Sequence, residues 1–224
     1  ATTQVYDGST VAALGGTATF VGEAVGQGTT SDGKFYTIDT ITRGGTIAGA
    51  FADRNVGPTK SITITGATAG TGEGNGNYNV VQQTGLTGAV TQKNITVSGS
   101  TATTQVYDGS TVAALGGTAV FQAGEAVGAG TTSDGKFYTI DTIANGGTIA
   151  GAFADRNVGP TKSITITGAT SGTGEGNGNY NVVQQTGLTG AVTQKNITCS
   201  GSTASTHVYD GSTVAALGGT GTFV

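Results

Sequence analysis

A short cluster of oxygen-bearing side chains, Glu73, Asn75 and Asn77, has the clearest capacity for chemistry in this sequence. Glycines separate these residues, and flexible loops of this kind can supply the oxygen ligands that calcium prefers. The same arrangement returns one repeat later, at Glu175, Asn177 and Asn179. However, only one residue in each cluster is charged, and the spacing is neither that of an EF-hand nor that of a glycine-aspartate β-roll. We therefore keep calcium binding as a weak alternative to an ordinary glycine-rich turn.

A Tyr-Asp-Gly tripeptide places a phenol beside a carboxylate at three points of the chain. The copies are Tyr6, Asp7 and Gly8; Tyr107, Asp108 and Gly109; and Tyr209, Asp210 and Gly211. Turn chemistry explains the tripeptide most simply, because aspartate can accept a backbone N–H while glycine adopts a positive φ. We expect a structural turn in each copy, with the tyrosine ring packed at the end of a domain.

No arrangement of residues in the sequence suggests catalysis. His207 is the only histidine, and it stands where Gln4 and Gln105 stand in the other copies. A catalytic triad and a histidine-ligated zinc site are therefore excluded. Ser9 and Ser31 occur in turns with no base nearby in the sequence. We expect no enzymatic activity and no cofactor, and we interpret His207 as a surface variant.

The single cysteine, Cys199, occupies the position that Val97 occupies one repeat earlier. Alternation along a strand would place Ile197 and Cys199 on the face toward the core, where cysteine acts as a small hydrophobe. An interchain disulfide or an introduced labelling site is the alternative, since one cysteine cannot form an intrachain disulfide.

The composition excludes several classes of protein. The 224 residues include 42 glycines without the three-residue period of collagen, and only 10% are charged, which is untypical of disorder. A net charge of −4 with nine scattered basic residues argues against a nucleic-acid partner. We find no stretch of 18 apolar residues and no signal-peptide pattern, so we expect a mature, soluble segment without membrane insertion.

The sequence repeats itself almost letter for letter, with a period of about a hundred residues that is large enough for a domain. We predict a first repeat domain at 1–93 that lacks its leading strand, a second at 94–194 and a partial third at 195–224. The chain is then a window cut from a longer array. Alternatively, its surplus strands complete the first unit of a neighbouring chain by strand addition, which would build a filament.

Short β-strands separated by glycine turns are predicted throughout each repeat, and helices should be nearly absent. The clearest alternation is Lys60 to Gly66, in which Ile62 and Ile64 should face the core. One extra residue in the second copy, within 121–124, suggests a surface loop, because exposed loops tolerate insertions. Seven to nine strands per unit, with turns every 8 to 12 residues, predict tandem immunoglobulin-like β-sandwiches arranged end to end. The predicted strands are 10–14, 17–20, 35–41, 46–52, 60–66, 78–81, 86–91 and 95–98.

Four sequence segments together resemble the YDG-type repeat domain of very large bacterial surface adhesins. The segments are Val-Tyr-Asp-Gly-Ser-Thr at 5–10, Ala-Gly-Ala-Phe-Ala-Asp-Arg-Asn-Val-Gly at 48–57, Lys-Ser-Ile-Thr-Ile-Thr-Gly at 60–66 and Gly-Asn-Tyr at 76–78. All of them recur in the second copy. The resemblance implies tandem stalks in secreted or surface-anchored adhesins and matrix proteins, without catalysis.

We therefore expect a structural stalk or spacer segment of an extracellular bacterial fibre, whose partners are neighbouring repeats of the same protein. A module that binds glycans or ice through a threonine-rich face is the alternative. Thr63, Thr65 and Thr87 are the candidates for that face, although their solvent exposure has the simpler interpretation of the wet side of a sheet.

Overall fold

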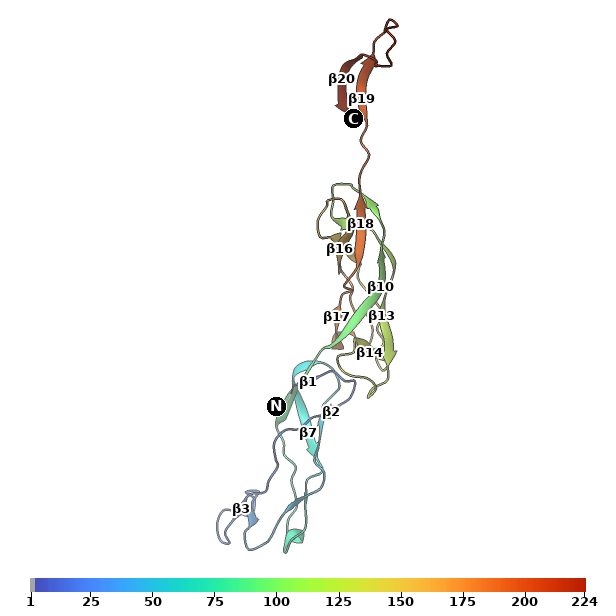
Figure 1. The fold of residues 1–224 in the computed structure, drawn as a ribbon. Coiled ribbons are helices and arrows are strands. Elements are labelled where there is room, and N and C mark those ends of the chain that lie inside the picture. Colours follow the sequence, from blue (N-terminus) through green and yellow to red (C-terminus); the bar gives the residue numbers. More distant parts are fainter. Residues whose placement is uncertain (1–2) are drawn as a thin grey trace. The chain divides into compact units, whose positions relative to one another are not determined.

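The computed structural model describes residues 3–224 and consists of short β-strands joined by loops (Figure 1). Within this range the helical elements are two single 3-10 turns, η1 (Asn75–Asn77) and η2 (Asn177–Asn179). The all-β prediction is therefore confirmed. No helix in the described range has the length and apolar character needed to cross a membrane.

The chain divides into two compact units, and each unit is discontinuous in sequence. The first unit takes in residues up to 100, 117–149 and 167–185, and the second takes in 101–116, 150–166 and 186–224. The division into repeat domains at 1–93, 94–194 and 195–224 stays a prediction from the sequence repeat.

A five-stranded sheet with the order β1-β9-β7-β6-β2 forms one part of the first unit. β1 runs parallel to β9, and the other neighbours are antiparallel. Its strands are β1 (Thr3–Val5), β2 (Val11–Ala12), β6 (Ala48–Phe51), β7 (Gly57–Thr65) and β9 (Leu86–Thr91).

Strand β7 follows the alternation expected from its sequence. Ile62 and Ile64 are buried, whereas Thr63 and Thr65 are exposed. The pairing of β7 with β9 shifts register between Gly57 and Lys60, next to Pro58, which cannot donate to the ladder.

A second sheet, most of whose residues belong to the first unit, is built around the strand that begins at the boundary between the two repeats. Its order is β14-β13-β10-β17, and β10 runs parallel to β17. Its strands are β10 (Lys93–Ala102), β13 (Leu115–Glu125), β14 (Lys136–Tyr138) and β17 (Tyr180–Val183). Period-two alternation along β10 buries Lys93, Ile95 and Val97 on one face. β10 begins at Lys93, the last residue of the predicted first repeat, and the rest of it lies in the predicted second repeat with the other strands of this sheet.

The same sequence forms a strand in one copy and not in the other. Tyr-Asn-Val-Val is strand β17 at 180–183, where it pairs with β10, but it has no strand assignment at 78–81. The predicted strand at 78–81 is therefore wrong, because a strand needs a neighbour to satisfy its backbone groups. Predicted strand 17–20 is likewise not a strand, and 35–41 shortens to β4 (Phe35–Tyr36). The remaining strands of the first unit are β3 (Gly22–Glu23), β5 (Arg43–Gly44) and β8 (Thr68–Ala69).

The extra residue of the second copy lies in a strand and not in the loop that we predicted. β13 runs through 121–124 and pairs with β14 in parallel. Gln122 lies opposite Lys136 and Glu125 opposite Tyr138, so three steps on β13 match two on β14. A β-bulge absorbs the insertion while it keeps the later register.

The second unit repeats the five-stranded sheet with the order β11-β18-β16-β15-β12, and it adds the hairpin β19-β20. The strands are β11 (Gln105–Val106), β12 (Val112–Ala113), β15 (Ala150–Phe153), β16 (Gly159–Thr167), β18 (Thr189–Thr193), β19 (Cys199–Ala204) and β20 (Leu217–Phe223). The sheets curl toward half-barrels and are not clear immunoglobulin-like sandwiches.

The prediction that Cys199 faces a core is wrong. Cys199 is exposed, and Ile197 is 65% exposed, whereas Val97 and Ile95 at the matching positions are almost completely buried. Within residues 3–224, β19 pairs only with β20, and all of its residues are exposed.

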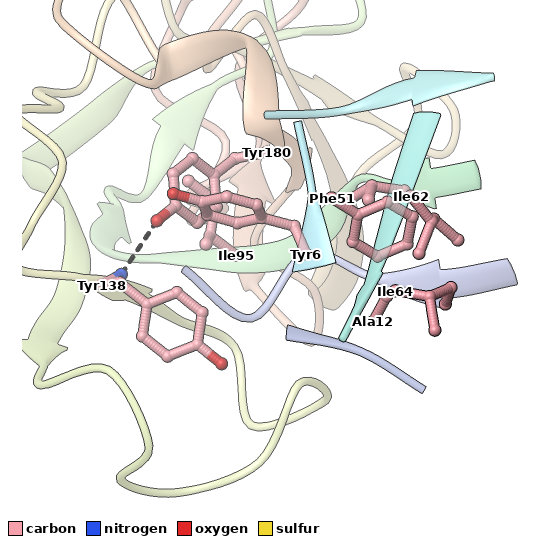
Figure 2. Close-up of a cluster of buried hydrophobic side chains, with 9 residues drawn as sticks. Tyr6, Ala12, Phe51, Ile62, Ile64, Ile95, Tyr138 and Tyr180 are labelled. Carbon is pink, nitrogen blue, oxygen red and sulfur yellow. Dashed lines mark hydrogen bonds between the residues drawn. The ribbon is translucent and has the colours of Figure 1, made fainter. Parts of the chain in front are cut away.

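Two groups of side chains make up the main core cluster (Figure 2). Phe51, Ile62 and Ile64 pack together on one face of the five-stranded sheet. Tyr6, Ile95, Tyr138 and Tyr180 form the other group, which joins the two sheets of the first unit.

Candidate functional site

The candidate site is a junction, inside the first compact unit, between residues of the first sequence copy and residues of the second. Tyr6 of the first copy is fully buried there, directly after β1. Its N–H donates to the Thr91 carbonyl at 2.8 Å, which fixes the backbone on the five-stranded sheet. The ring meets those of Tyr138 and Tyr180 edge to face, with centroids 5.9 and 5.5 Å away. Such edge-to-face pairs are favourable beyond the area they bury.

A buried carboxylate, Asp141, accepts hydrogen bonds from both copies. The Tyr6 and Tyr180 hydroxyls each donate to its Oδ2 at 2.6 Å. Arg54 of the first copy donates to Oδ1 at 3.0 Å and thereby balances the charge. The Tyr180 oxygen in turn accepts the Tyr138 N–H at 2.9 Å (Figure 2). The carboxylate is thus satisfied on both oxygens, as a buried charge must be.

The loop that follows Arg54 is hydrogen-bonded to Asn179 of the second copy. Asn179 Oδ1 accepts the Val56 N–H at 2.9 Å, and its Nδ2 donates to Asn55 Oδ1 at 3.1 Å. Tyr6 and the Arg54–Val56 loop come from the first and second of the recurring motifs, so these two motifs form one docking surface.

Both phenols at Asp141 are held in their protonated form. Burial raises the pKa of Tyr6 and of Tyr180, and the hydrogen bond to the Asp141 carboxylate raises each pKa further. At neutral pH the two tyrosines therefore act as fixed hydrogen-bond donors.

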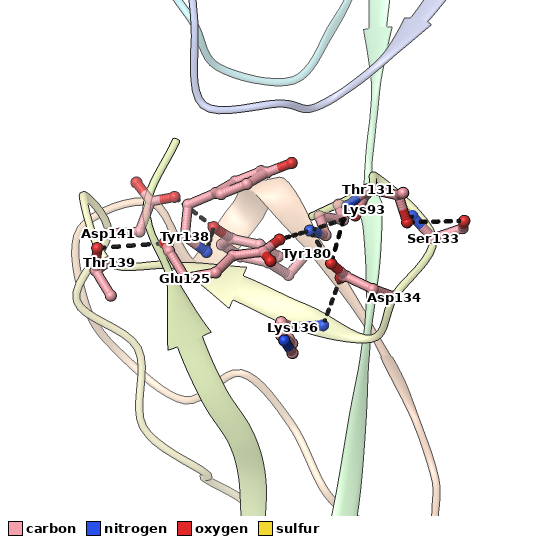
Figure 3. Close-up of polar contacts among 10 residues, drawn as sticks. All are labelled: Lys93, Glu125, Thr131, Ser133, Asp134, Lys136, Tyr138, Thr139, Asp141 and Tyr180. Carbon is pink, nitrogen blue, oxygen red and sulfur yellow. Dashed lines mark hydrogen bonds and ion pairs between the residues drawn. The ribbon is translucent and has the colours of Figure 1, made fainter. Parts of the chain in front are cut away.

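A second charged cluster surrounds Lys93, whose side chain is fully buried (Figure 3). Its Nζ lies 2.7 Å from Glu125 Oε1, 3.0 Å from Asp134 Oδ1 and 3.0 Å from the Thr131 carbonyl. The ammonium also lies over the Tyr138 ring, 4.0 Å from the centroid. The ammonium group of Lys93, on the buried face of β10, is therefore surrounded by acceptors and an aromatic ring of the second copy.

The ion pairs decide the protonation of this cluster. Burial alone would lower the pKa of Lys93, but hydrogen bonds to Glu125 and Asp134 outweigh it and leave the pKa raised. Burial acts to raise the pKa of Asp134, but backbone donors at Lys136 and Thr131, together with Lys93, bring it well below its usual range. Lys93 and Asp134 therefore stay charged at neutral pH.

Two stretches of the chain, residues 1–85 and 91–187, match the family model of the YDG domain. This chain belongs to the YDG domain family. The two matches are tandem YDG copies, which confirms the resemblance seen in the sequence at the level of the domain. No curated protein and no solved structure matches the chain.

The calcium candidates of the two YDG copies serve different contacts. Asn177 Nδ2 donates to the Gly172 carbonyl at 2.7 Å, and Asn75 contacts Gly70 in the same way. Glu175 lies 3.8 Å from Arg54, and Asn179 belongs to the junction. Residues 3–224 contain no cluster of three or more acidic, histidine or cysteine side chains suited to a metal. Calcium binding by Glu73 and Asn77 stays a prediction from the sequence.

Each Tyr-Asp-Gly tripeptide forms the same turn. The aspartate accepts an N–H two residues on at 2.8 Å, and the glycine has a φ of 76° to 85°. The pairs are Asp7 with Ser9, Asp108 with Ser110 and Asp210 with Ser212. The tyrosines differ, since Tyr6 is buried, Tyr107 is half-buried and Tyr209 is 92% exposed.

His207 replaces the glutamine that bonds the turn aspartate. Gln4 donates to Asp7 at 3.1 Å and Gln105 to Asp108 at 3.3 Å, while His207 Nε2 lies 3.0 Å from Asp210. The substitution thus keeps a local contact.

Lys93, Glu125 and Asp141 are the functional residues that our sequence reasoning missed. One signal was present: Lys93 shares the period-two face of Ile95 and Val97, which predicts a buried ion pair. No comparable signal identified its acidic partners, which lie 32 and 41 residues further along.

Proposed function

We propose that this chain is a non-enzymatic structural segment of an extracellular bacterial adhesin or matrix fibre, in which YDG copies act as a stalk. In this proposal the copies are sandwich-like modules joined end to end, and the work of the segment is mechanical. It carries a remote binding module away from the surface or builds the fibre itself.

The observation that supports the proposal is the interlocking of two consecutive copies. Tyr6 of the first copy is completely buried, and its hydroxyl and the Arg54 guanidinium both donate to Asp141 of the second copy. Pulling the copies apart would leave the Asp141 carboxylate without the Tyr6 and Arg54 donors, and a buried charge is expensive to leave unpaired. A rigid connection of this kind suits a spacer. A flexible linker behaves as a random coil, so without an applied force its ends would lie close together.

Force spectroscopy on the tethered chain tests this function. We expect the two copies to resist extension together and to open in one event at high force. Lys93→Met should lower the opening force, because Glu125 and Asp134 would remain as two buried carboxylates without a cation. Lys195→Met is the matched control, since Lys195 is exposed and should leave the force unchanged. Opening at low force, or equal effects of both variants, would refute the stalk.

A glycan- or ice-binding module is the second candidate, and one observation favours it. Ser61 on β7 lies directly opposite Thr87 on β9, so Thr63 and Thr65 extend one exposed polar face with Thr87. A glycan array and an ice-recrystallisation assay would separate the two functions. Binding that is lost in Thr63→Val and Thr87→Val would support this candidate.

A further inference from the structure

The way in which β10 completes the second copy provides a template for a contact that the first copy lacks within the described residues. Four residues, Lys93–Thr96, lie in register with Tyr180–Val183 of β17. Lys93 enters the Glu125–Asp134 pair, and the Thr96 N–H donates to the Gly135 carbonyl at 2.9 Å. Asn181 donates to Asn94 across the pair at 2.9 Å.

The first copy carries the same acceptor with almost the same geometry. The Glu23 side chain is 7% exposed, as is that of Glu125, and Asp32 is 22% exposed against 20% for Asp134. A Cβ built on Gly28 would meet the carboxylates of both Glu23 and Asp32, and one built on Gly130 would meet the second-copy pair in the same way. The Glu23 and Asp32 carboxylates therefore lie next to each other in the same way as the Glu125 and Asp134 carboxylates of the second copy.

A cation that hydrogen-bonds this pair is missing from the described residues. Glu23 Oε2 is buried without a hydrogen-bond partner. Lys34 approaches no closer than 3.6 Å to Glu23 and 3.5 Å to Asp32, with its own side chain 41% exposed. The backbone beside the pair is also open. No atom lies within 4 Å of the position that a Cβ on Gly33 would occupy, whereas a Cβ on its counterpart Gly135 would meet the Thr96 side chain.

The chain contains a second donor segment with the sequence of the first. Residues 195–198 read Lys-Asn-Ile-Thr, like 93–96, and they are exposed and lie outside any strand. They precede β19, so they can pair with another strand without opening the β19-β20 hairpin.

We propose that residues 195–198 of one chain add to the first copy of a second chain, with Lys195 between Glu23 and Asp32. Lys195 then lies opposite Tyr78 and Thr198 opposite Val81, whose side chain is 82% exposed. Donor and acceptor are different surfaces, so the contact is head to tail and propagates into a filament. The inference rests on the proposed function, because it treats the YDG copies as interlocking modules.

Sedimentation velocity of the 224-residue chain across a range of concentrations tests the proposal. The mass should rise with concentration in steps of 21.8 kDa. Lys195→Gln and Glu23→Gln should each raise the concentration needed for association by roughly tenfold or more, because each leaves a buried charge unpaired. Arg43→Asn is the matched control: it removes the same charge, and the second copy has Asn145 at that position.

A mixture of the two variants tests the polarity of the contact. Lys195→Gln chains keep the acceptor and Glu23→Gln chains keep the donor, so an equimolar mixture should form dimers and stop there. A monomer at every concentration, or variants that associate like the parent chain, would overturn the proposal. The stalk function is judged separately, because the Lys93→Met force measurement reports on the junction within one chain.

Discussion

At the scale of single residues, Asp141 and Lys93 each act as a buried charge that gathers partners from distant parts of the chain. Asp141 accepts from Tyr6, 135 residues away, and from Tyr180 and Arg54. Lys93 bonds two carboxylates. Such charges are costly to bury unless each is fully paired, so they stabilise only one arrangement of the copies.

Tyr6→Phe should destabilise the first unit by about 2 kcal/mol, because it removes one hydrogen bond to a charged group while it keeps the ring. Urea unfolding measures the change. Tyr107→Phe is the control, since Tyr107 is half-buried, and we expect a loss of less than about 0.5 kcal/mol. Equal losses in the two variants would show that Asp141 contributes nothing specific.

Stability should be greatest between weakly acidic and weakly alkaline pH. The pKa values of Lys93, Tyr6 and Tyr180 are raised on folding, so their contribution is complete below their unfolded values, near 10, and is lost as pH rises through the folded values. The pKa of Asp134 is lowered on folding, so its contribution is present above about 4 and is lost as pH falls through the folded value.

The melting temperature measured against pH checks this behaviour. We expect a plateau between about pH 5 and 9 with a decline on both sides. The alkaline decline should become shallower in Tyr6→Phe, which has no phenol to ionise at that site. An alkaline limb unchanged by this variant would contradict the assignment.

At the scale of strands, β10 decides which identical segments become ordered. Tyr-Asn-Val-Val is a strand beside β10 and irregular at 78–81. The segment after Leu115 forms an 11-residue strand, whereas the matching residues after Leu14 give only β3. Tyr-Asn-Val-Val is identical in the two copies, so for that segment the neighbouring strand makes the difference, whereas the segment from Leu115 also has Val120 in place of Thr19 and one extra residue.

Ile95→Ala should cost about 2–5 kcal/mol, because the side chain is fully buried among Tyr6, Tyr138 and Tyr180. Ile197→Ala is the same substitution in the same local sequence, and it should cost less than about 0.5 kcal/mol in dilute solution. Urea unfolding of both variants at low concentration provides the comparison. A large effect of Ile197→Ala there would mean that 195–198 is already packed in the monomer.

At the scale of the whole molecule, the compact units do not follow the repeats. The first unit combines residues of both copies, and β10 belongs to a sheet made with later strands. We therefore expect the first unit to unfold as one cooperative body. The β19-β20 hairpin is exposed along its whole length and should open independently.

Hydrogen exchange followed by mass spectrometry tests this expectation. Peptides that cover 93–98 should exchange as slowly as those of β7, whereas peptides covering 199–204 should exchange quickly at low concentration. Fast exchange at 93–98 alone would indicate that β10 detaches and that the first unit is not one cooperative body.

The sequence by itself determined the strand content, the turns and the repeat. Alternation identified β7 and the core positions Ile62 and Ile64, and the Asp-Gly pairs identified the turns, because these features depend on neighbours two residues apart. The motifs also predicted the YDG family.

Only the tertiary structure decided which copy each strand serves and what the motifs contact. Tyr6 and Arg54 lie 135 and 87 residues before their shared partner Asp141. Lys93 lies 32 residues before its partner Glu125. Sequence periodicity carries no information on pairings at such separations, and it cannot distinguish identical segments whose neighbours differ. Cys199 illustrates this limit: the alternation that buries Val97 leaves Cys199 exposed, because the part of the chain that the structure describes places no second layer over β19.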